Sequence, residues 1–537
     1  MKTTILLLTM TAACALNSQA QNHAATEAIN STALASHIKV LASDAFEGRK
    51  PFTRGEDSSV NYIAREFKKI GLIPGNGDSY FQNVPMVSIL SKPTPLVIKG
   101  NNGTMNLDYG TDFVAATRYP VPQVKLPPSE MVFAGYGIVA PEFGWNDYAG
   151  LDVKGKTVVV LINDPGQLDP ALFRGKNMTY YGRWTYKFEE ASRQGAAGVI
   201  IIHNDAGASY PWSVVRNGWA NSKLHLASDE KDIHRTLMEG WITQDAAIRM
   251  FKQAGVSPDI MEQAKTKGFK PVDLHLTAEV VINNTIQNST SRNVIGILNG
   301  ASAPAEAIAY TAHWDHFGIG PVINGDSIYN GAVDNATGVA GLLVLANAFK
   351  KLNPAPKRSV IFVAVTGEEQ GLLGSEYYVN HLKNPASIVA DINLDVMNTF
   401  GKTSDVTIIG YGQSELEDYA AKVAAAQGRT IVPEAHPEGG WFFRSDHFNF
   451  AKKGIPGLYI GPGTNVIGKS KDYASEKIKL YNTTKYHTPK DEYDPETWDL
   501  AGMTEDVRLL FQVGYKLANN GLWPKWKETS EFKALRK

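Results

Sequence analysis

The chain is nearly free of cysteine. Cys14 is the only cysteine among 537 residues, and it lies in a segment that is expected to be removed. A mature chain without thiols has no disulfides, no cysteine-ligated zinc and no cysteine nucleophile. Any metal ion would therefore have to be held by histidine and carboxylate side chains.

An excess of charge and a long apolar run are also lacking. The formal net charge is -1 and there is no long basic segment, which argues against a nucleic-acid partner. No stretch beyond the first twenty residues approaches the ~20 apolar residues of a transmembrane helix, so no membrane span is expected. The length instead favours two or more folded units. Nothing in the pattern indicates an oligomeric state.

The first twenty residues have the pattern of a signal peptide. Lys2 is followed by the mostly apolar run 5–15, and Ser18-Gln19-Ala20 offers small residues for cleavage. The pattern predicts an exported protein, periplasmic or extracellular. A lipid anchor on Cys14 is the alternative, although Thr11 fits a lipobox poorly.

Apolar periodicity divides the rest of the chain into a split domain and an insert. Residues 33–72 show helical spacing, whereas β-type runs dominate after residue 128. A polar, turn-rich segment at 283–292 is expected to close that region. We therefore predict a signal peptide at 1–20, a split domain formed by 21–127 and 284–537, and an insert at 128–283. Within the insert we expect strands at 131–139, 156–162 and 198–203 and a helix at 184–193.

The pattern after residue 290 is typical of an α/β domain. Continuous apolar strands alternate with helices, which predicts a mixed, mostly parallel sheet flanked by helices on both faces. Ligands of such sheets lie beyond the carboxyl ends of the strands. The expected strands are 307–312, 359–366, 387–394 and 455–460, with a helix at 338–349.

Charged residues stand at the ends of three of these strands. Like charges gathered at one edge of a sheet repel one another and need a cation between them. Histidine and carboxylate ligands suit zinc, with manganese or cobalt left open. An aspartate that bridges two ions, with one histidine and one further acid for each, would make a site of two metal ions that activates a shared water. The residues concerned are His313, Asp315, Glu368, Glu369 and Asp395, together with Asp334 in a loop before a helix.

The flanking segments resemble the zinc aminopeptidase family, which also includes glutamate carboxypeptidases and the transferrin-receptor ectodomain. The resemblance implies a zinc peptidase fold of the phosphorylase/hydrolase type. The strings that carry it are Leu41–Asp44, Glu47–Arg49, Ala312–His316, Gly331–Gly338, Gly367–Glu369, Asn393–Asp395, Ser445–His447, Gly454–Pro456 and Tyr486–Pro489.

The resemblance also implies a site with two zinc ions. His313 and Asp395 would bind one ion, Glu369 and His487 the other, and Asp334 would bridge them.

Further roles follow from the same resemblance. Glu368 would be the general base, Asp315 would orient the ring of His313, and Tyr486 would stabilise the oxyanion. Tyr486 as an ordinary core residue is the alternative. Arg444 is a candidate substrate contact, or equally a structural ion-pair residue.

The insert resembles a protease-associated domain. Lys156–Val160 and Ala196–Ile200 are the recurrent strand motifs. Such a domain would shape access to the active site, or serve only as a structural lid. Its histidines at positions 203, 225 and 234 are not expected to bind metal.

Together these features predict a secreted metallo-exopeptidase, foremost an aminopeptidase that hydrolyses the N-terminal bond of short peptides. A carboxypeptidase of the same fold is the first alternative. A glutaminyl cyclase, which typically uses one zinc, and a receptor-like relative without activity are the others.

Overall fold

A computed structural model describes residues 23–227 and 235–536. The predicted signal peptide at 1–20, Cys14 and His234 lie outside these residues. The chain divides into two units. Unit 1 comprises residues up to Val84, Thr290–Ala435 and Arg444–Lys537, and unit 2 comprises Pro85–Ser289 and His436–Phe443.

The centre of unit 1 is a mixed, mostly parallel sheet, as the sequence predicts. Strand β14 (Ala303–His313) pairs in parallel with β17 (Arg358–Val365) and with β18 (Ile388–Asn393). Strand β18 continues in parallel to β21 (Gly457–Gly461). The antiparallel neighbours are the end of β13 (Val272–Leu298) beside β17, and β19 (Asp405–Ile408) beside β21. Strand β20 (Thr430–Pro433) pairs in parallel with β19, and β1 (Ile73–Pro74) pairs with β13.

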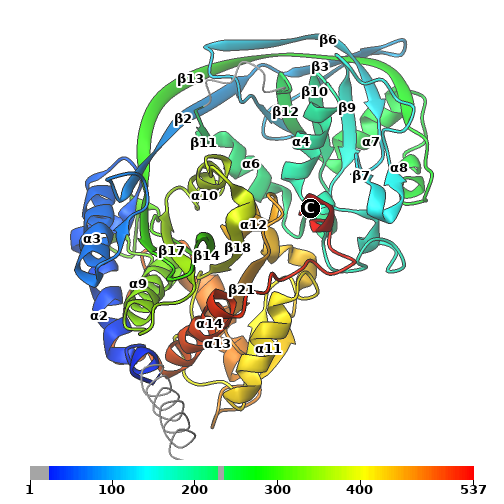
Figure 1. The fold of residues 1–537 in the computed structure, drawn as a ribbon. Coiled ribbons are helices and arrows are strands. Elements are labelled where there is room, and N and C mark those ends of the chain that lie inside the picture. The colour runs from blue at the N-terminus through cyan, green and yellow to red at the C-terminus, as the bar shows by residue number, and fades with distance from the viewer. Residues whose placement is uncertain (1–22, 228–234, 537) are drawn as a thin grey trace, which may run out of the picture. The chain divides into compact units, whose positions relative to one another are not determined.

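Helices cover both faces of this sheet (Figure 1). Helices α2 (Ser31–Leu41), α3 (Arg54–Ile70), α9 (Thr337–Lys350) and α14 (Ala501–Asn520) pack on one face, and α10 (Leu373–Asn380) and α12 (His447–Ala451) on the other. Side chains of β14 alternate between the two faces, so Tyr310 lies in one apolar core and Ala309 in the other. The remaining elements are α11 (Leu416–Ala426), α13 (Tyr473–Thr484) and the hairpin of β15 (Gly318–Ile323) and β16 (Asp326–Tyr329).

Helix α9 is surrounded by apolar neighbours. Within 23–227 and 235–536, one helical segment, Ala332–Lys350, is long and apolar enough to cross a membrane, and almost all of it is buried inside the fold. This composition is that of a central core helix, because a helix packed on every side needs no polar face.

The predicted strands and helices of unit 1 are confirmed within a few residues. The prediction of a turn-rich segment at 283–292 is wrong. This segment is the middle of the long strand β13, and Asn283 pairs with Gln123 of β6 (Gln123–Phe133). Most side chains between 283 and 290 are exposed or half-buried. A strand exposed on both faces has no need of apolar residues, so its composition resembles that of a turn.

Unit 2 has two apolar cores of its own. Strands β9 (Thr157–Leu161), β10 (Gly198–Ile202) and β12 (Met238–Ile242) are parallel, as is β6 beside β9. The helices are α4 (Trp184–Arg193), α5 (Asp205–Ala208), α6 (Trp212–Ala220), α7 (Gln244–Gln253) and α8 (Ile260–Gln263). The other strands are β2 (Phe81–Pro93), β3 (Leu96–Gly100), β4 (Gly103–Leu107), β5 (Phe113–Ala116), β7 (Val139–Ala140), β8 (Trp145–Asn146) and β11 (Lys223–Leu226).

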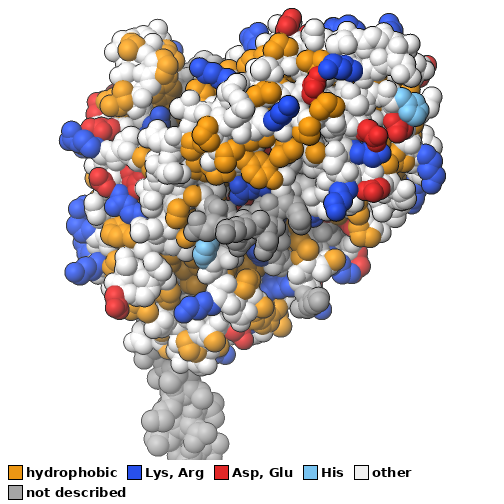
Figure 2. All heavy atoms as spheres, turned by 90° about the horizontal axis from the view of Figure 1, so that it is seen from above, with side chains coloured by type: hydrophobic (Ala, Val, Ile, Leu, Met, Phe, Trp, Pro, Cys, Tyr) orange, Lys and Arg blue, Asp and Glu red, His pale blue; other side chains and the backbone are white. Residues whose placement is uncertain are grey.

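The boundary of unit 2 differs from the expected insert. The unit begins at Pro85 and not at residue 128. Residues 85–127 join it because β3 pairs with β13 and β5 pairs with β12, and these long-range pairings have no signal in local composition. On the surface that Figure 2 presents, acidic and basic side chains are interspersed, in keeping with the small net charge.

Arg49 joins the N-terminal segment to the loops that follow the central strands. Its guanidinium is fully buried and donates hydrogen bonds to the main-chain oxygens of Leu41 (2.8 Å), Trp314 (2.9 Å), Asn330 (2.5 Å) and Gly331 (2.7 Å). Burial lowers the pKa of Arg49 to about 10, and the charges of Asp491 and Asp334 oppose this shift. Because one guanidinium donates to all four carbonyl groups, it ties the N-terminal segment at Leu41 to the chain at Trp314 and at Asn330–Gly331.

We therefore expect Arg49→Met to destabilise unit 1 strongly, because several buried carbonyls would lose their donor. The expected cost is about 3 kcal/mol or more. Thermal unfolding would measure it against Arg54→Met, since the Arg54 side chain is 90% exposed. Equal unfolding temperatures for the two variants would contradict this role of Arg49.

Candidate metal centre

The predicted site residues come from the ends of neighbouring strands and from two loops of unit 1. His313 is the last residue of β14, Glu368 and Glu369 follow β17, and Asp395 follows β18. Because these strands are parallel neighbours, their carboxyl ends meet at one edge of the sheet. The loop before α9 supplies Asp334, and the segment after α13 supplies His487.

Asp334 lies between two imidazoles. Its Oδ1 is 3.2 Å from Nε2 of His313, and its Oδ2 is 3.4 Å from Nε2 of His487. His313 Nε2 is also 3.3 Å from Oδ1 of Asp395, and His487 Nε2 is 3.2 Å from Oε2 of Glu369. The five predicted ligands thus form two groups that share Asp334.

Glu368 lies at the edge of the first group. Its Oε2 is 3.9 Å from Nε2 of His313, and its side chain is largely buried. Its main-chain N–H donates to Oδ1 of Asp315 at 3.1 Å. Glu368 and Glu369 are adjacent in sequence, yet they contact different histidines.

Asp315 contacts the ring of His313 differently from the expected arrangement. Nδ1 of His313 is 3.1 Å from the main-chain oxygen of Asp315, whereas the carboxylate oxygen Oδ1 is 3.9 Å away. The main chain of Asp315 thus makes the closer contact. Its carboxylate instead accepts the Glu368 N–H, so the residue links the histidine loop to the glutamate loop.

Two further residues, His316 and Ser445, contact the site although the sequence predicts no role for them. Nδ1 of the buried His316 is 2.6 Å from Oε1 of Glu369, the oxygen that does not face His487. Ser445 Oγ donates to Oδ2 of Asp395 at 2.7 Å and accepts from Nδ2 of Asn393 at 2.6 Å. Both lie in strings that carry the family resemblance, which was the available signal.

The loop that carries Asp334 is held by Asp491. The main-chain N–H groups of Val333 and Asp334 donate to the two oxygens of the Asp491 carboxylate, at 3.0 and 3.1 Å. Gly331 begins this loop with φ 54°, and a Cβ there would lie 2.2 Å from the main-chain oxygen of Asp334. Only glycine fits this position, which lies in the left-handed region.

The electrostatics of the site demand positive charge. Burial lowers the pKa of each histidine, but the surrounding carboxylates outweigh it, so the pKa of His313 is well above its usual range and that of His487 rises to about 9. Burial would raise the pKa of Asp334, yet the two histidine hydrogen bonds hold it below its ordinary value. Burial and the charges of Asp395 and Glu369 raise the pKa of Glu368 well above its ordinary value, against the opposing effect of His313.

The donor set fits a pair of divalent ions. Two clusters of potential ligand atoms within 23–227 and 235–536 lie close enough to hold a metal: His313, Asp334 and Asp395 form one, and His316, Asp334 and Glu369 the other. Asp334 is common to both and has one oxygen on each side. Nitrogen and carboxylate donors without sulfur are a zinc-type set. His487 and His316 both contact Glu369, so both histidines lie beside the second group.

The two remaining predicted residues are Tyr486, which directly precedes His487, and Arg444. The ring of Tyr486 stacks on that of His487 with centroids 3.6 Å apart, and 37% of Tyr486 is exposed. Burial, followed by the charges of Asp334 and Glu369, raises its pKa, so the phenol keeps its proton. Arg444 is half-buried and directly precedes Ser445.

Comparison with known proteins agrees with these motifs. Residues 293–511 match the model of Peptidase family M28. The match contains most of the strings that carry the resemblance and every predicted site residue. This match agrees with the resemblance to zinc aminopeptidases that the sequence motifs carry.

Individual relatives match part of the chain. A probable zinc metalloprotease of Pyrenophora tritici-repentis is 27% identical over 252 residues, which are 41% of this chain and 52% of that protein. Aminopeptidase YwaD of Bacillus subtilis is 30% identical over 208 residues, 38% of this chain and 40% of that protein. The chain therefore spans about half or less of the length of these curated relatives. Among solved structures, an aminopeptidase from Aneurinibacillus sp. strain AM-1 has a TM-score of 0.48 and 20% identity, with 93% of this chain and 96% of that chain covered.

The contact between His316 and Glu369 generates a prediction. His316→Phe should weaken zinc binding by roughly 10–100-fold, because Glu369 would lose the partner that orients its second oxygen. Competition with a chromogenic chelator would measure this, with His381→Phe as the matched control. His381 is exposed and contacts the main chain of its own helix. Unchanged zinc affinity in His316→Phe would exclude an orienting role, and loss of one whole equivalent of zinc would make His316 a ligand itself.

Proposed function

We propose that the protein is a zinc-dependent exopeptidase that removes the N-terminal residue from short peptides. The observation that carries the proposal is the Asp334 carboxylate between His313 and His487, with a further acid beside each histidine. Such a set would hold two zinc ions, with His313 and Asp395 on one, Glu369 and His487 on the other, and Asp334 shared. Bound there, zinc would supply Lewis acidity toward the scissile carbonyl and lower the pKa of water.

Glu368 is the general base of this proposal. Its Oε2 lies 3.9 Å from Nε2 of His313, farther than the 3.2 and 3.3 Å of Asp334 and Asp395. It would take a proton from the attacking water and pass it to the leaving amine. The Asp315 carboxylate, which accepts the Glu368 N–H, fixes the loop from which this base projects.

Tyr486 is the proposed donor to the oxyanion. Its phenol keeps its proton over the working pH range, because burial and the nearby carboxylates raise its pKa. A neutral donor at this position can stabilise negative charge that develops on the carbonyl oxygen. Its ring is held by stacking on His487.

A carboxylate that is not assigned to zinc supports the aminopeptidase assignment. Glu368 lies 3.9 Å from His313 and offers an acidic partner to a free substrate ammonium, whereas Asp334, Glu369 and Asp395 are the proposed zinc ligands. Relatives such as YwaD of Bacillus subtilis and NAALADL1 of Mus musculus are named as aminopeptidases. A substrate carboxylate would instead need a cationic pocket, for which Arg444 is the candidate.

The cellular setting is part of the proposal. The pattern of residues 1–20 supports export to the periplasm or the extracellular space, where short peptides are available as substrates. Unit 2 would act as a protease-associated domain, supported by the motifs Lys156–Val160 and Ala196–Ile200, which overlap β9 and β10.

The two adjacent glutamates should respond differently to the same substitution. Glu368→Gln keeps the volume of the side chain and removes the base, so turnover should fall roughly 10²–10⁴-fold while metal content stays that of the wild type. Glu369→Gln removes a charged ligand and should lower both zinc content and turnover. Steady-state kinetics with elemental analysis would separate the two. Near-normal turnover of Glu368→Gln would remove it as the base.

Blocking the substrate amine tests the polarity of the enzyme. We expect leucyl-anilide to be hydrolysed and N-acetyl-leucyl-anilide to resist, because acetylation removes the charge that the carboxylates attract. The loss should exceed roughly 100-fold, the scale for one buried charged contact. Faster turnover of N-blocked peptides, with release of the C-terminal residue, would make the protein a carboxypeptidase.

A further inference from the structure

The ring of His487 is oriented differently from the ring of His313. A histidine that binds a metal usually donates its second ring N–H to a neighbouring oxygen, which fixes the direction of the ring. His313 has such a contact, because its Nδ1 is 3.1 Å from the main-chain oxygen of Asp315. In the part of the chain that the structure describes, Nδ1 of His487 has no hydrogen-bond or ion-pair partner, and only its Nε2 contacts carboxylates. Another contact therefore has to set the direction of this ring.

The main chain on both sides of His487 is fixed. The N–H of Tyr486 donates to the main-chain oxygen of Tyr481 at 2.9 Å, and the N–H of Thr488 donates to that of Lys485 at 2.9 Å. His487 itself has φ 56°, in the left-handed region that residues with a side chain rarely adopt. These turns place the Cβ of His487, but the two side-chain torsions of the imidazole are set only by what the ring contacts.

Two aromatic rings contact the imidazole of His487. The ring of Tyr486 is stacked on it with centroids 3.6 Å apart and planes at 27°, and the ring of Phe317 is tilted against it at 4.5 Å and 57°. Contact with two rings at different angles restricts both side-chain torsions. His381 provides a contrast, because its stack on Tyr377 at 3.8 Å is accompanied by a contact of 2.8 Å between its Nδ1 and the main-chain oxygen of Tyr377.

Phe317 is held in place by the hairpin that follows it. The residue is half-buried and directly precedes β15, and the next residue, Gly318, pairs with Tyr329 of β16. The ring of Phe317 lies 6.4 Å from the ring of the buried Tyr329 and meets His316 edge-on at 5.0 Å. The hydroxyl of Tyr329 donates to the main-chain oxygen of Pro321 at 3.2 Å. The hairpin thus provides a fixed base for the Phe317 ring.

We propose that Phe317 is a positioning residue of the metal centre. Its ring, together with that of Tyr486, sets the direction of the His487 imidazole. In that direction Nε2 faces Asp334 and Glu369, at 3.4 and 3.2 Å. Phe317 has no ligand atom, so it acts on zinc only through His487. The inference rests on the proposed function, since that function assigns His487 to one of the two zinc ions.

Competition for zinc between the metal-stripped mature protein and a chromogenic chelator tests the proposal. Phe317→Leu should weaken one of the two zinc ions roughly 3–10-fold, the scale of one aromatic pair, and leave the other as in the wild type. Phe317→Tyr keeps the ring and should bind both ions as the wild type does.

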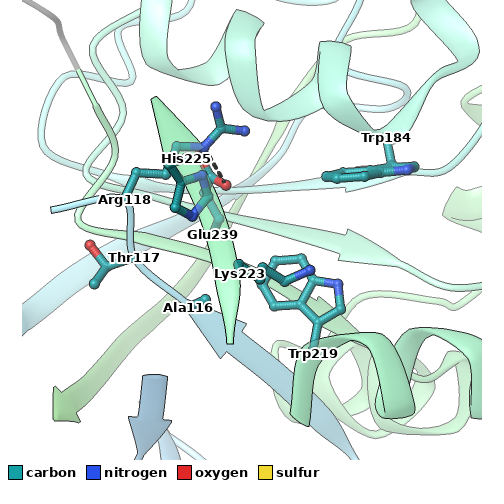
Figure 3. Close-up of a pocket in the computed structure, with 8 residues that line it drawn as sticks. All are labelled: Ala116, Thr117, Arg118, Trp184, Trp219, Lys223, His225 and Glu239. Atoms are coloured by element: carbon teal, nitrogen blue, oxygen red, sulfur yellow. Dashed lines mark hydrogen bonds and ion pairs between the residues drawn. The ribbon is translucent and has the colours of Figure 1, made fainter. Parts of the chain in front are cut away.

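Trp184→Leu is the matched control. Trp184 is also a half-buried aromatic residue, and its ring meets that of Phe188 edge-on at 5.7 Å. It belongs to unit 2, where it lines a small pocket (Figure 3), whereas every residue of the metal centre belongs to unit 1. Trp184→Leu should therefore lose a comparable ring contact and bind both zinc ions as the wild type does.

A second pair of variants separates positioning of His487 from a general structural role. In His487→Ala the ring that Phe317 positions is absent. Adding Phe317→Leu to this variant should therefore not change the affinity for the ion that remains. A further loss of at least ~3-fold in the double variant would mean that Phe317 acts on the centre by another route, and would overturn the inference.

The remaining outcomes also decide the inference. Unchanged zinc affinity in Phe317→Leu, equal weakening of both ions, or the same loss in Phe317→Tyr would overturn it and leave the proposed function intact, since the wild type would still hold two ions. A wild type without a second ion would overturn the proposed function and the inference together. If Phe317→Leu fails to fold, Phe317→Met replaces it with the same expected loss, because methionine fills the space without a ring.

Discussion

Four carboxylates at one edge of a sheet repel one another, and the structure of unit 1 is arranged around this repulsion. Asp334 is held between His313 and His487, and the surrounding carboxylates raise the pKa of both imidazoles, so the site favours positive charge. A pair of divalent ions would meet the same electrostatic demand. The buried supports serve the same end: Asp491 and Arg49 fix the loop of Asp334, and Ser445 fixes the second oxygen of Asp395.

Much of unit 1 could be predicted because its strands are buried on both faces. Continuous apolar runs as short as 307–312 and 359–366 favour buried strands over helices, and the charged residues that end them mark the ligand edge of a parallel sheet. The prediction of turns at 283–292 is wrong because an exposed strand carries no apolar signature. The start of unit 2 at Pro85 depends on the pairing of β3 and β5 with distant strands, and such pairings leave no trace in local composition.

The site was predictable in its members but not in its contacts. The family strings led to all five expected ligands, and the structure gathers them. The role of His316 could not be read from the string His313-Trp314-Asp315-His316, because which histidine faces which carboxylate depends on side-chain directions in a loop. For the same reason the main chain of Asp315, and not its carboxylate, makes the closer contact with His313.

The sharing of Asp334 between two metal ions is the central claim, and zinc stoichiometry tests it most directly. Equilibrium dialysis of the metal-stripped protein against buffered zinc, followed by elemental analysis, should give two ions per chain in the wild type. Asp334→Ala should lose both ions together, because no other carboxylate contacts both His313 and His487 among the residues that the structure describes. One ion in the wild type, or one ion retained tightly by Asp334→Ala, would contradict the account.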